Sequence, residues 1–181
     1  MWSSKLKISC LMGALLFLGA CGFRPLYGQS GGQTALSDLS SIRIEPIADR
    51  LGQELHNNLL DLLTPQGRPQ KPRYSLKIKL SQSKKTLAVQ KSAFATRANL
   101  IIRAVFSLSA VGVGAAATEE VLLSGESSII SSYNILDSDF ATVIAERNAR
   151  TQAVRELADN IRIRLAVYFT QNLQRTPSPK P

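Results

Sequence analysis

An unbroken alternation of apolar and polar residues in the middle of the chain restricts its fold more than any other pattern in the sequence. From Tyr74 to Ser81 every second residue is apolar, and each residue between them is a serine or a lysine. Successive side chains of a β-strand point to opposite faces, so this run predicts a strand with one buried and one solvated face. Such a strand needs neighbouring strands and a layer that covers its apolar face.

Three further segments predict the rest of the sheet. Residues 41–47 begin with the same alternation, and Pro46 suits a strand end or an edge. Residues 100–111 predict a second long strand with its even-numbered side chains inward. Residues 121–133 predict a fourth strand, in which Gly125 is expected to form a bulge.

Two amphipathic helices are predicted to cover the sheet. The first starts at Asp49 as N-cap, has leucines at helical spacing and stops before Pro65. The second starts at Asp137 or Ser138 and continues to about Leu173. Its expected buried stripe consists of Phe140, Ile144, Val154, Leu157, Ile161 and Leu165.

These segments predict an α/β fold of the α+β type, with element order β-α-β-β-β-α. The economical arrangement is a single-layer, mixed four-stranded sheet with two amphipathic helices packed on one face. A right-handed crossover through the first helix makes strands one and two parallel, while strands two to four form an antiparallel meander. We expect one globular domain over residues 41–175 and a frayed tail over residues 176–181.

The N-terminus has the pattern of a secretory leader. Residues 1–20 carry two early lysines followed by an apolar run that is too short for a comfortable membrane span. The run ends in Leu18-Gly-Ala-Cys21, which resembles the lipobox of bacterial lipoproteins. That resemblance implies an N-acyl group and an S-diacylglycerol on Cys21, cleavage of residues 1–20, and, with Gly22 after the cysteine, the outer membrane as destination. Residues 21–40 then form a lipidated N-terminus and a Gly/Ser/Gln-rich tether.

Positive charge is concentrated in one acid-free window. Between Asp61 and Glu119 the chain has no acidic residue but many lysines and arginines, which predicts an unopposed positive field. Base-stacking aromatic residues are sparse, so we expect a membrane anion rather than nucleic acid as the ligand. For any single lysine a plain solvated surface remains the alternative. The candidate anion-binding residues are Lys77, Lys79, Lys84, Lys85, Lys91, Arg97 and Arg103.

No catalytic or metal-binding constellation is evident. His56 is the only histidine, and the mature chain would retain no cysteine to complete a metal site or a nucleophilic pair. The acidic residues are scattered rather than paired for general acid and base catalysis. We therefore expect neither enzymatic activity nor a cofactor other than the lipid on Cys21.

The block Cys21-Gly-Phe-Arg-Pro-Leu-Tyr27 resembles the start of mature LptE-type lipopolysaccharide-assembly lipoproteins, especially those of alphaproteobacteria. Ser131-Ser-Tyr133, Phe140-Ala141 and the Ala- and Arg-rich helix are similar to the C-terminal half of that family. The resemblance implies a non-enzymatic partner of the LptD β-barrel that supports its assembly and helps deliver lipopolysaccharide to the outer leaflet. The basic cluster would then hold lipopolysaccharide phosphates. A structural adaptor lipoprotein of another envelope complex is the alternative.

Overall fold

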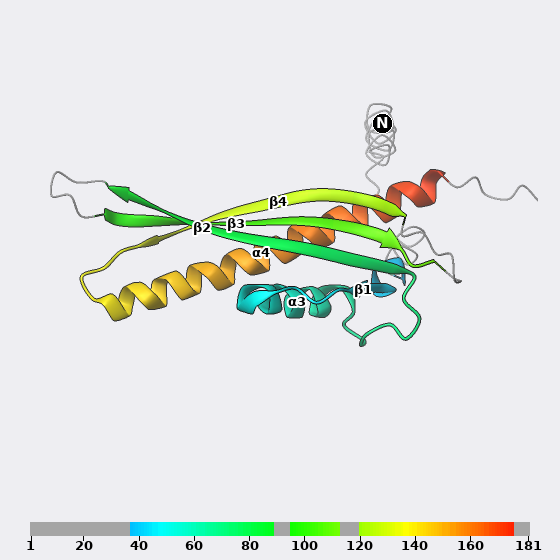
Figure 1. Ribbon diagram of the computed structural model, residues 1–181, viewed down its shortest axis with the longest axis horizontal. Helices are drawn as coiled ribbons and strands as arrows, with labels where there is room; N and C mark the ends of the chain where they lie inside the picture. Colours follow the sequence, from blue (N-terminus) through cyan, green and yellow to red (C-terminus); the bar gives the residue numbers. More distant parts are fainter. Residues whose placement is uncertain (1–36, 89–94, 113–119, 176–181) are drawn as a thin grey trace, which may run out of the picture.

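The computed structural model describes residues 37–88, 95–112 and 120–175. Its sheet has the order β1-β2-β3-β4, with β1 parallel to β2 and the other pairs antiparallel. Figure 1 shows both helices beneath the same face of this sheet. The predicted fold class, element order and mixed topology are confirmed. The elements are β1 (Ile42–Ile44), α3 (Asp49–Leu63), β2 (Tyr74–Ala88), β3 (Ala95–Ala110), β4 (Val121–Asn134) and α4 (Asp139–Arg175).

The core lies between the sheet and the two helices. Leu76 of β2 and Leu100, Ile102 and Leu108 of β3 are completely buried on the sheet face that the helices cover, here called the inner face. Fully burying each such side chain stabilises the fold by roughly 1.5–3 kcal/mol. The helices contribute Leu55, Leu59, Val154, Leu157, Ile161 and Leu165 to the same core.

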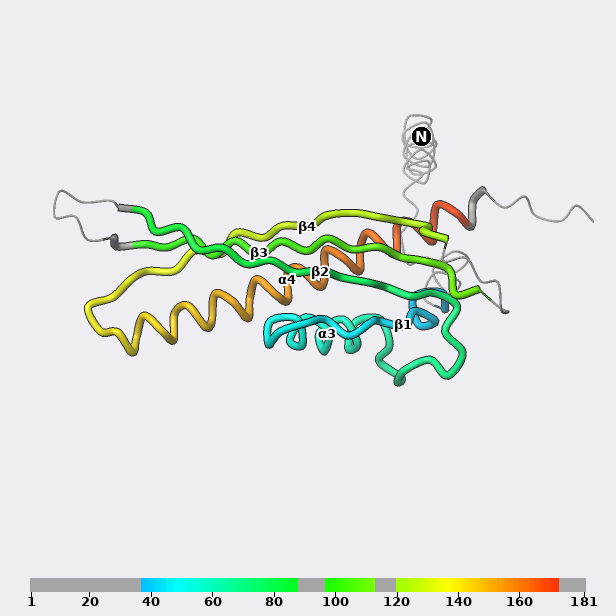
Figure 2. Tube along the Cα trace, in the orientation of Figure 1, coloured from blue at the N-terminus to red at the C-terminus, as the bar shows by residue number. Residues whose placement is uncertain are grey.

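The β2–β3 hairpin is longer than the sequence predicts. It extends past the beginning of α3, and Figure 2 shows this arm together with the start of α4 at the end of the molecule far from β1. Lys84 and Lys85 therefore lie within a strand, not in a connecting segment. Along the arm the inner face of β2 becomes polar, at Gln82, Lys84 and Thr86.

Gly125 does not form the predicted bulge. It pairs in regular register with Phe106, and the irregularity in this ladder lies between Leu108 and Ser109. A Cβ atom built at position 125 would lie 2.8 Å from the ring atom Cζ of Phe106. The glycine is required because the Phe106 ring occupies the space where a side chain would stand.

The two helix starts differ from each other. Ser138 caps α4 as predicted, because its Oγ accepts a hydrogen bond from the Ala141 N–H at 3.4 Å. Asp49 does not cap α3: the N-cap position is Ala48, and no side chain caps this helix. Asp49 is instead the first helical residue and has a positive φ of 67°.

The first turns of α4 were predicted to be buried, and this is wrong. Phe140 is 76% exposed and Ile144 is 37% exposed, because the start of α4 diverges from the strands (Figure 2). The remaining four residues of the predicted stripe are buried. No helix in the described ranges is both long enough and apolar enough to cross a membrane.

Residues 37–40, which the sequence analysis assigned to the tether, form a helical turn that packs on the domain. Leu39 belongs to the core, and the Asp38 carboxylate accepts a hydrogen bond from Arg73 Nη1 at 3.0 Å. The domain therefore begins before residue 41. Residues 1–36, which include Cys21 and the leader, and the tail 176–181 lie outside the described residues.

Candidate functional site

The sheet face opposite the helices is the candidate site, and we call it the outer face. It consists of the odd-numbered residues of β2 and β3 and the even-numbered residues of β4, which pair in rows across the sheet. From the β1 end, the rows are Lys77–Ser107–Ser124, Lys79–Val105–Glu126, Ser81–Arg103–Ser128, Ser83–Ile101–Ile130, Lys85–Asn99–Ser132 and Leu87–Arg97–Asn134.

Five of the predicted anion-binding residues are brought together on this face. Lys77, Lys79 and Arg103 lie in three consecutive rows, whereas Lys85 and Arg97 lie in the two rows nearest the hairpin end. All five are exposed. Strand alternation places them on one face because each has an odd number. Lys91 falls outside the described residues.

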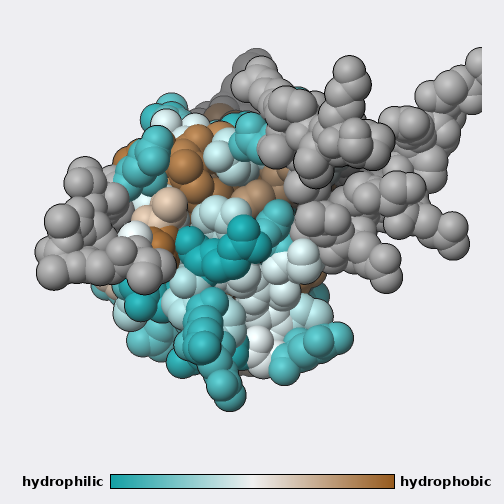
Figure 3. All heavy atoms as spheres, turned by 90° about the vertical axis from the view of Figure 1, so that its right-hand side faces the viewer, coloured by the Kyte–Doolittle hydropathy of each residue, from teal (hydrophilic) through white to brown (hydrophobic). Residues whose placement is uncertain are grey.

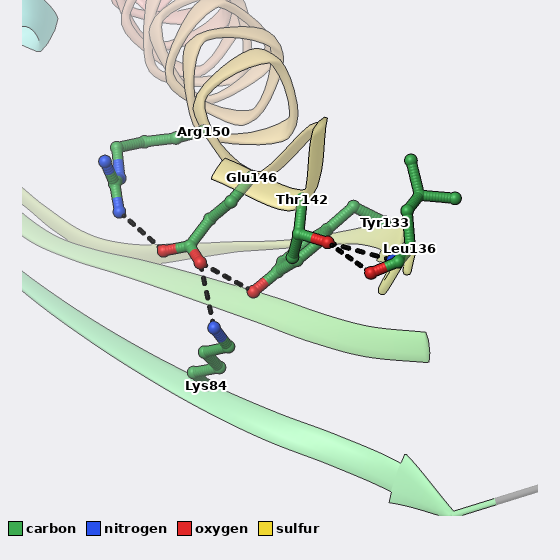
Figure 4. Close-up of polar contacts among 6 residues, drawn as sticks. All are labelled: Lys84, Tyr133, Leu136, Thr142, Glu146 and Arg150. Atoms are coloured by element: carbon green, nitrogen blue, oxygen red, sulfur yellow. Dashed lines mark hydrogen bonds and ion pairs between the residues drawn. The ribbon is translucent and has the colours of Figure 1, made fainter. Parts of the chain in front are cut away.

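Lys84 does not belong to the outer face. It points to the inner side, where its Nζ donates a hydrogen bond to Glu146 Oε2 at 2.8 Å and lies 5.2 Å from the centre of the Tyr133 ring (Figure 4). Tyr133 Oη also donates to Glu146 Oε2 at 2.8 Å, and Arg150 Nη2 donates to Oε1 at 2.9 Å. Glu146 thus joins α4 to β2 and β4.

The electrostatics of this cluster stabilise the charged forms of Glu146 and Lys84 and the neutral form of Tyr133. Hydrogen bonds from Lys84 and then Tyr133 lower the pKa of Glu146 below its ordinary value. The hydrogen bond to Glu146 raises the pKa of Lys84, and burial raises the pKa of Tyr133. Lys84 therefore holds the arm to α4 and lies on the other face from the five outer-face cations, and its role as a ligand contact stays a prediction.

The positive field of the outer face is smaller than the sequence predicted. Arg103 forms an ion pair with Glu126 at 3.1 Å between Nε and Oε1, so this acid from outside the acid-free window neutralises it. Lys77 lies near Glu45, whose pKa is lowered chiefly by a hydrogen bond from Ser75. Within the described ranges, the side chains of Lys79, Lys85 and Arg97 have no ion-pair partner.

Apolar side chains on the outer face were missed by the sequence analysis. Ile130 is 64% exposed, Val105 is 49% exposed and Leu87 is 41% exposed, and Ile101 stands directly beside Ile130. The available signal was the pair Ile129-Ile130, because consecutive isoleucines in a strand must place one side chain on each face. The outer face therefore presents cations separated by apolar groups.

Such a face can bind an amphiphile with anionic head groups. Lys and Arg side chains hold phosphate oxygens by charge-assisted hydrogen bonds, while the apolar groups contact hydrocarbon. Among the described residues, no three His, Cys, Asp or Glu side chains lie close enough together to hold a metal ion.

Comparison with known proteins identifies the family. The model of the family "LptE: Lipopolysaccharide-assembly" matches residues 39–165. The uncharacterized protein RP188 of Rickettsia prowazekii (strain Madrid E) is 24% identical over 152 residues, which cover 84% of this chain and 90% of that protein.

Two solved structures show the same fold. Rare lipoprotein B from Shewanella oneidensis has a TM-score of 0.54 at 13% identity and is matched over 74% of this chain and 98% of that one. The uncharacterized lipoprotein B from Nitrosomonas europaea has a TM-score of 0.53 at 15% identity, over 77% of this chain and 88% of that one. Because the family model spans nearly the whole described domain, the chain belongs to the LptE family of lipopolysaccharide-assembly proteins.

Proposed function

We propose that this chain is a non-enzymatic lipoprotein of the outer membrane that partners an LptD-type β-barrel. In this role it supports the assembly of the barrel and the delivery of lipopolysaccharide to the outer leaflet. The observation that carries the proposal is the match of the LptE family model over residues 39–165. Acyl chains on Cys21 would anchor the protein, because each buried methylene contributes roughly 0.8 kcal/mol to membrane binding.

The outer face supports lipopolysaccharide as the ligand. Lys79, Lys85 and Arg97 are exposed and free of ion-pair partners among the described residues, so they are available to phosphate groups. Val105, in the same row as Lys79, and Ile130, in the row next to Lys85, have exposed side chains that suit acyl chains. A ligand with phosphate groups and hydrocarbon chains matches both the cations and the apolar side chains of the outer face.

Capture from membranes tests the barrel partnership. The full chain with a C-terminal tag is expressed in its own host, extracted in mild detergent and purified, and the proteins that accompany it are identified. We expect one large outer-membrane barrel in near-equal amount. Purification of the tagged chain without a barrel would contradict the proposal.

Depletion of the chain separates the proposal from an adaptor role in another complex. We expect lipopolysaccharide to disappear from the cell surface while the bulk of outer-membrane proteins is still inserted. A general loss of barrel insertion with surface lipopolysaccharide retained would favour the adaptor role instead.

A further inference from the structure

Among the residues that the structure describes, the sheet has three open stretches of edge, and two of them have features that disfavour pairing with another chain. β1 is only three residues long and is soon followed by Pro46. The part of β2 beyond its pairing with β1 carries four lysines, at positions 77, 79, 84 and 85. Short strands, proline and lysine are the usual protection of a sheet edge.

The third open edge, that of β4, lacks this protection. β4 is a 14-residue strand without proline, lysine or arginine, and Glu126 is its one charged residue. In the described ranges its only strand partner is β3. Alternate N–H and C=O groups along its other side therefore point away from the sheet, and its Ile130 and Val121 side chains are 64% and 58% exposed.

An apolar groove lies directly beside this edge. It has a volume of about 270 Å³ and is lined by Phe106 and Leu123 from the sheet and by Ile163, Val167 and Tyr168 from α4. Figure 1 shows α4 running obliquely to the strands, with its C-terminal half beside β4. Figure 3, an end-on view, shows hydrophobic side chains reaching the surface in the upper half of the molecule, where Figure 1 places the start of β4.

Edge and groove together form a position that suits one added strand. A strand added to β4 would pair with its open backbone groups, and its inward side chains, at every second residue, would fill the groove. A helix or a free acyl chain could fill the groove but would leave the backbone groups of β4 unpaired. Arg164 at the groove has no ion-pair partner among the described residues, so an acidic residue on the incoming strand would complement it.

We propose that the open edge of β4, with the groove against α4, receives an extended strand of the barrel partner. The incoming segment has alternating apolar residues and an acidic residue placed to reach Arg164. This inference rests on the proposed function, because that function supplies a partner rich in β-strands. It adds the mode of contact and the surface used.

Site-specific photo-crosslinking tests the mode of contact. A benzoylphenylalanine residue is placed singly at Ser124, Ser128 and Ser132, which are exposed outer-face positions on β4. Ser81 and Ser83, which lie on the same face but on β2 at the opposite edge, serve as controls. We expect the three β4 positions to crosslink to one short barrel segment, with the crosslinked residue moving by about four as the probe moves by four, as paired strands require. Scattered crosslinks, or none from β4, would overturn the inference.

Charge placed on the edge and in the groove tests its contribution to binding. In the full chain, Ser128→Lys combined with Val167→Lys should reduce barrel capture by about tenfold or more, because lysine blocks edge pairing and the groove loses its apolar floor. The matched control is Ser83→Lys with Val143→Lys, which adds the same charges at exposed positions elsewhere. Equal thermal unfolding of both variants shows that folding is retained.

The outcomes separate the two proposals. Unchanged capture by the edge variant, with capture by the unmodified chain intact, overturns the strand inference alone. Crosslinks to a second copy of this chain also overturn it, because the occupant is then not the barrel. Failure of the unmodified chain to capture a barrel overturns the proposed function and this inference with it.

Discussion

Glu146 connects three elements through one carboxylate. It accepts hydrogen bonds from Lys84 of β2, Tyr133 of β4 and Arg150 of α4, at 2.8–2.9 Å. Its side chain is 24% exposed, so water screens these contacts only in part. Nothing near Glu146 in the sequence signals this role, because its partners lie 62 and 13 residues earlier and 4 residues later.

Replacing Glu146 with glutamine should lower the free energy of unfolding by about 1–2 kcal/mol, since it removes the charge from three hydrogen bonds. The matched control is Glu156→Gln, because Glu156 is exposed and, among the described residues, accepts a side-chain hydrogen bond only from Gln152 on the same helix. Urea unfolding at neutral pH measures both variants. Equal stability of the two would show that the cluster contributes nothing.

Glu146 should also make the stability of the fold depend on pH. Because the pKa of Glu146 is lower in the folded chain than its ordinary 4.5, its contribution is complete above that pH and is lost as the pH falls through the lowered value. The Glu146→Gln variant should therefore lose less stability than the unmodified chain between about pH 5 and pH 3. Parallel loss in the two proteins would assign the acid sensitivity to other groups.

The close approach of the Phe106 ring to Gly125 restricts which residue can stand at position 125. Phe106 is 2% exposed and its ring cannot move freely, so a methyl group 2.8 Å from Cζ must displace it. Gly125→Ala should destabilise the fold by about 1–3 kcal/mol. In a Phe106→Leu background the same change should cost about 1 kcal/mol less, which a double-mutant cycle by thermal unfolding measures. Additive effects would exclude a direct clash.

At the scale of elements, α4 consists of two segments with different surroundings. Its middle is buried on the sheet and on α3, whereas its first turns are exposed. Leu157→Ala should therefore cost about 2–5 kcal/mol. Phe140→Ser, at a 76% exposed position of the same helix, should change stability by less than about 0.5 kcal/mol. Chemical denaturation compares them, and a large loss for Phe140→Ser would mean that the helix start is packed.

Sequence periodicity predicts a strand or helix correctly where one of its faces is buried. It fails where both faces of the element are exposed. Tyr74 to Ser81 alternates because its inner side chains meet α3 and α4, so the strand was predictable. Residues 82–88 continue the same strand without alternation, because the arm extends past α3 and is ordered by pairing with β3. The period of α4 likewise continues to Phe140 although no sheet residue covers it there.

The composition of the outer face could be predicted in part, because strand alternation is visible in the sequence. The lysines of β2 share a face through their spacing, which the sequence shows directly. Ion pairs such as Arg103 with Glu126 join strands whose register is set by the fold, so the sequence gives no sign of which cations are neutralised. Lys84 was expected in a connecting segment because the predicted strand ended at Ser81, which hid its even-numbered position on the inner side.

At the scale of the whole molecule, the cations of the outer face and the open edge lie on different elements. The cations of the outer face come from β2 and β3, whereas the open edge and its groove belong to β4 and α4. α4 is 37 residues long and thus spans about 55 Å, so it supports both the groove and, through Glu146, the far arm. A variant of the β2 and β3 cations should therefore leave the open edge unchanged, whereas Ile130 belongs to both surfaces.

Charge reversal on the outer face provides the whole-molecule test. Lys79→Glu with Lys85→Glu should weaken binding to immobilised lipopolysaccharide by roughly tenfold at low salt, and the difference should shrink above about 0.5 M salt as screening increases. Barrel capture and thermal stability should stay unchanged, because exposed charges contribute little to folding. Lys71→Glu, a reversal in the loop before β2, is the matched control.

The apolar side chains of the outer face should contribute to lipopolysaccharide binding independently of the cations. Ile130→Ser with Val105→Ser removes hydrocarbon contacts while leaving every cation in place, and both positions are at least 49% exposed. This variant should bind lipopolysaccharide several-fold more weakly at all salt concentrations, because burial of apolar surface is not screened by ions. Loss of affinity that disappears at high salt would contradict this, since it would show that only charge holds the ligand.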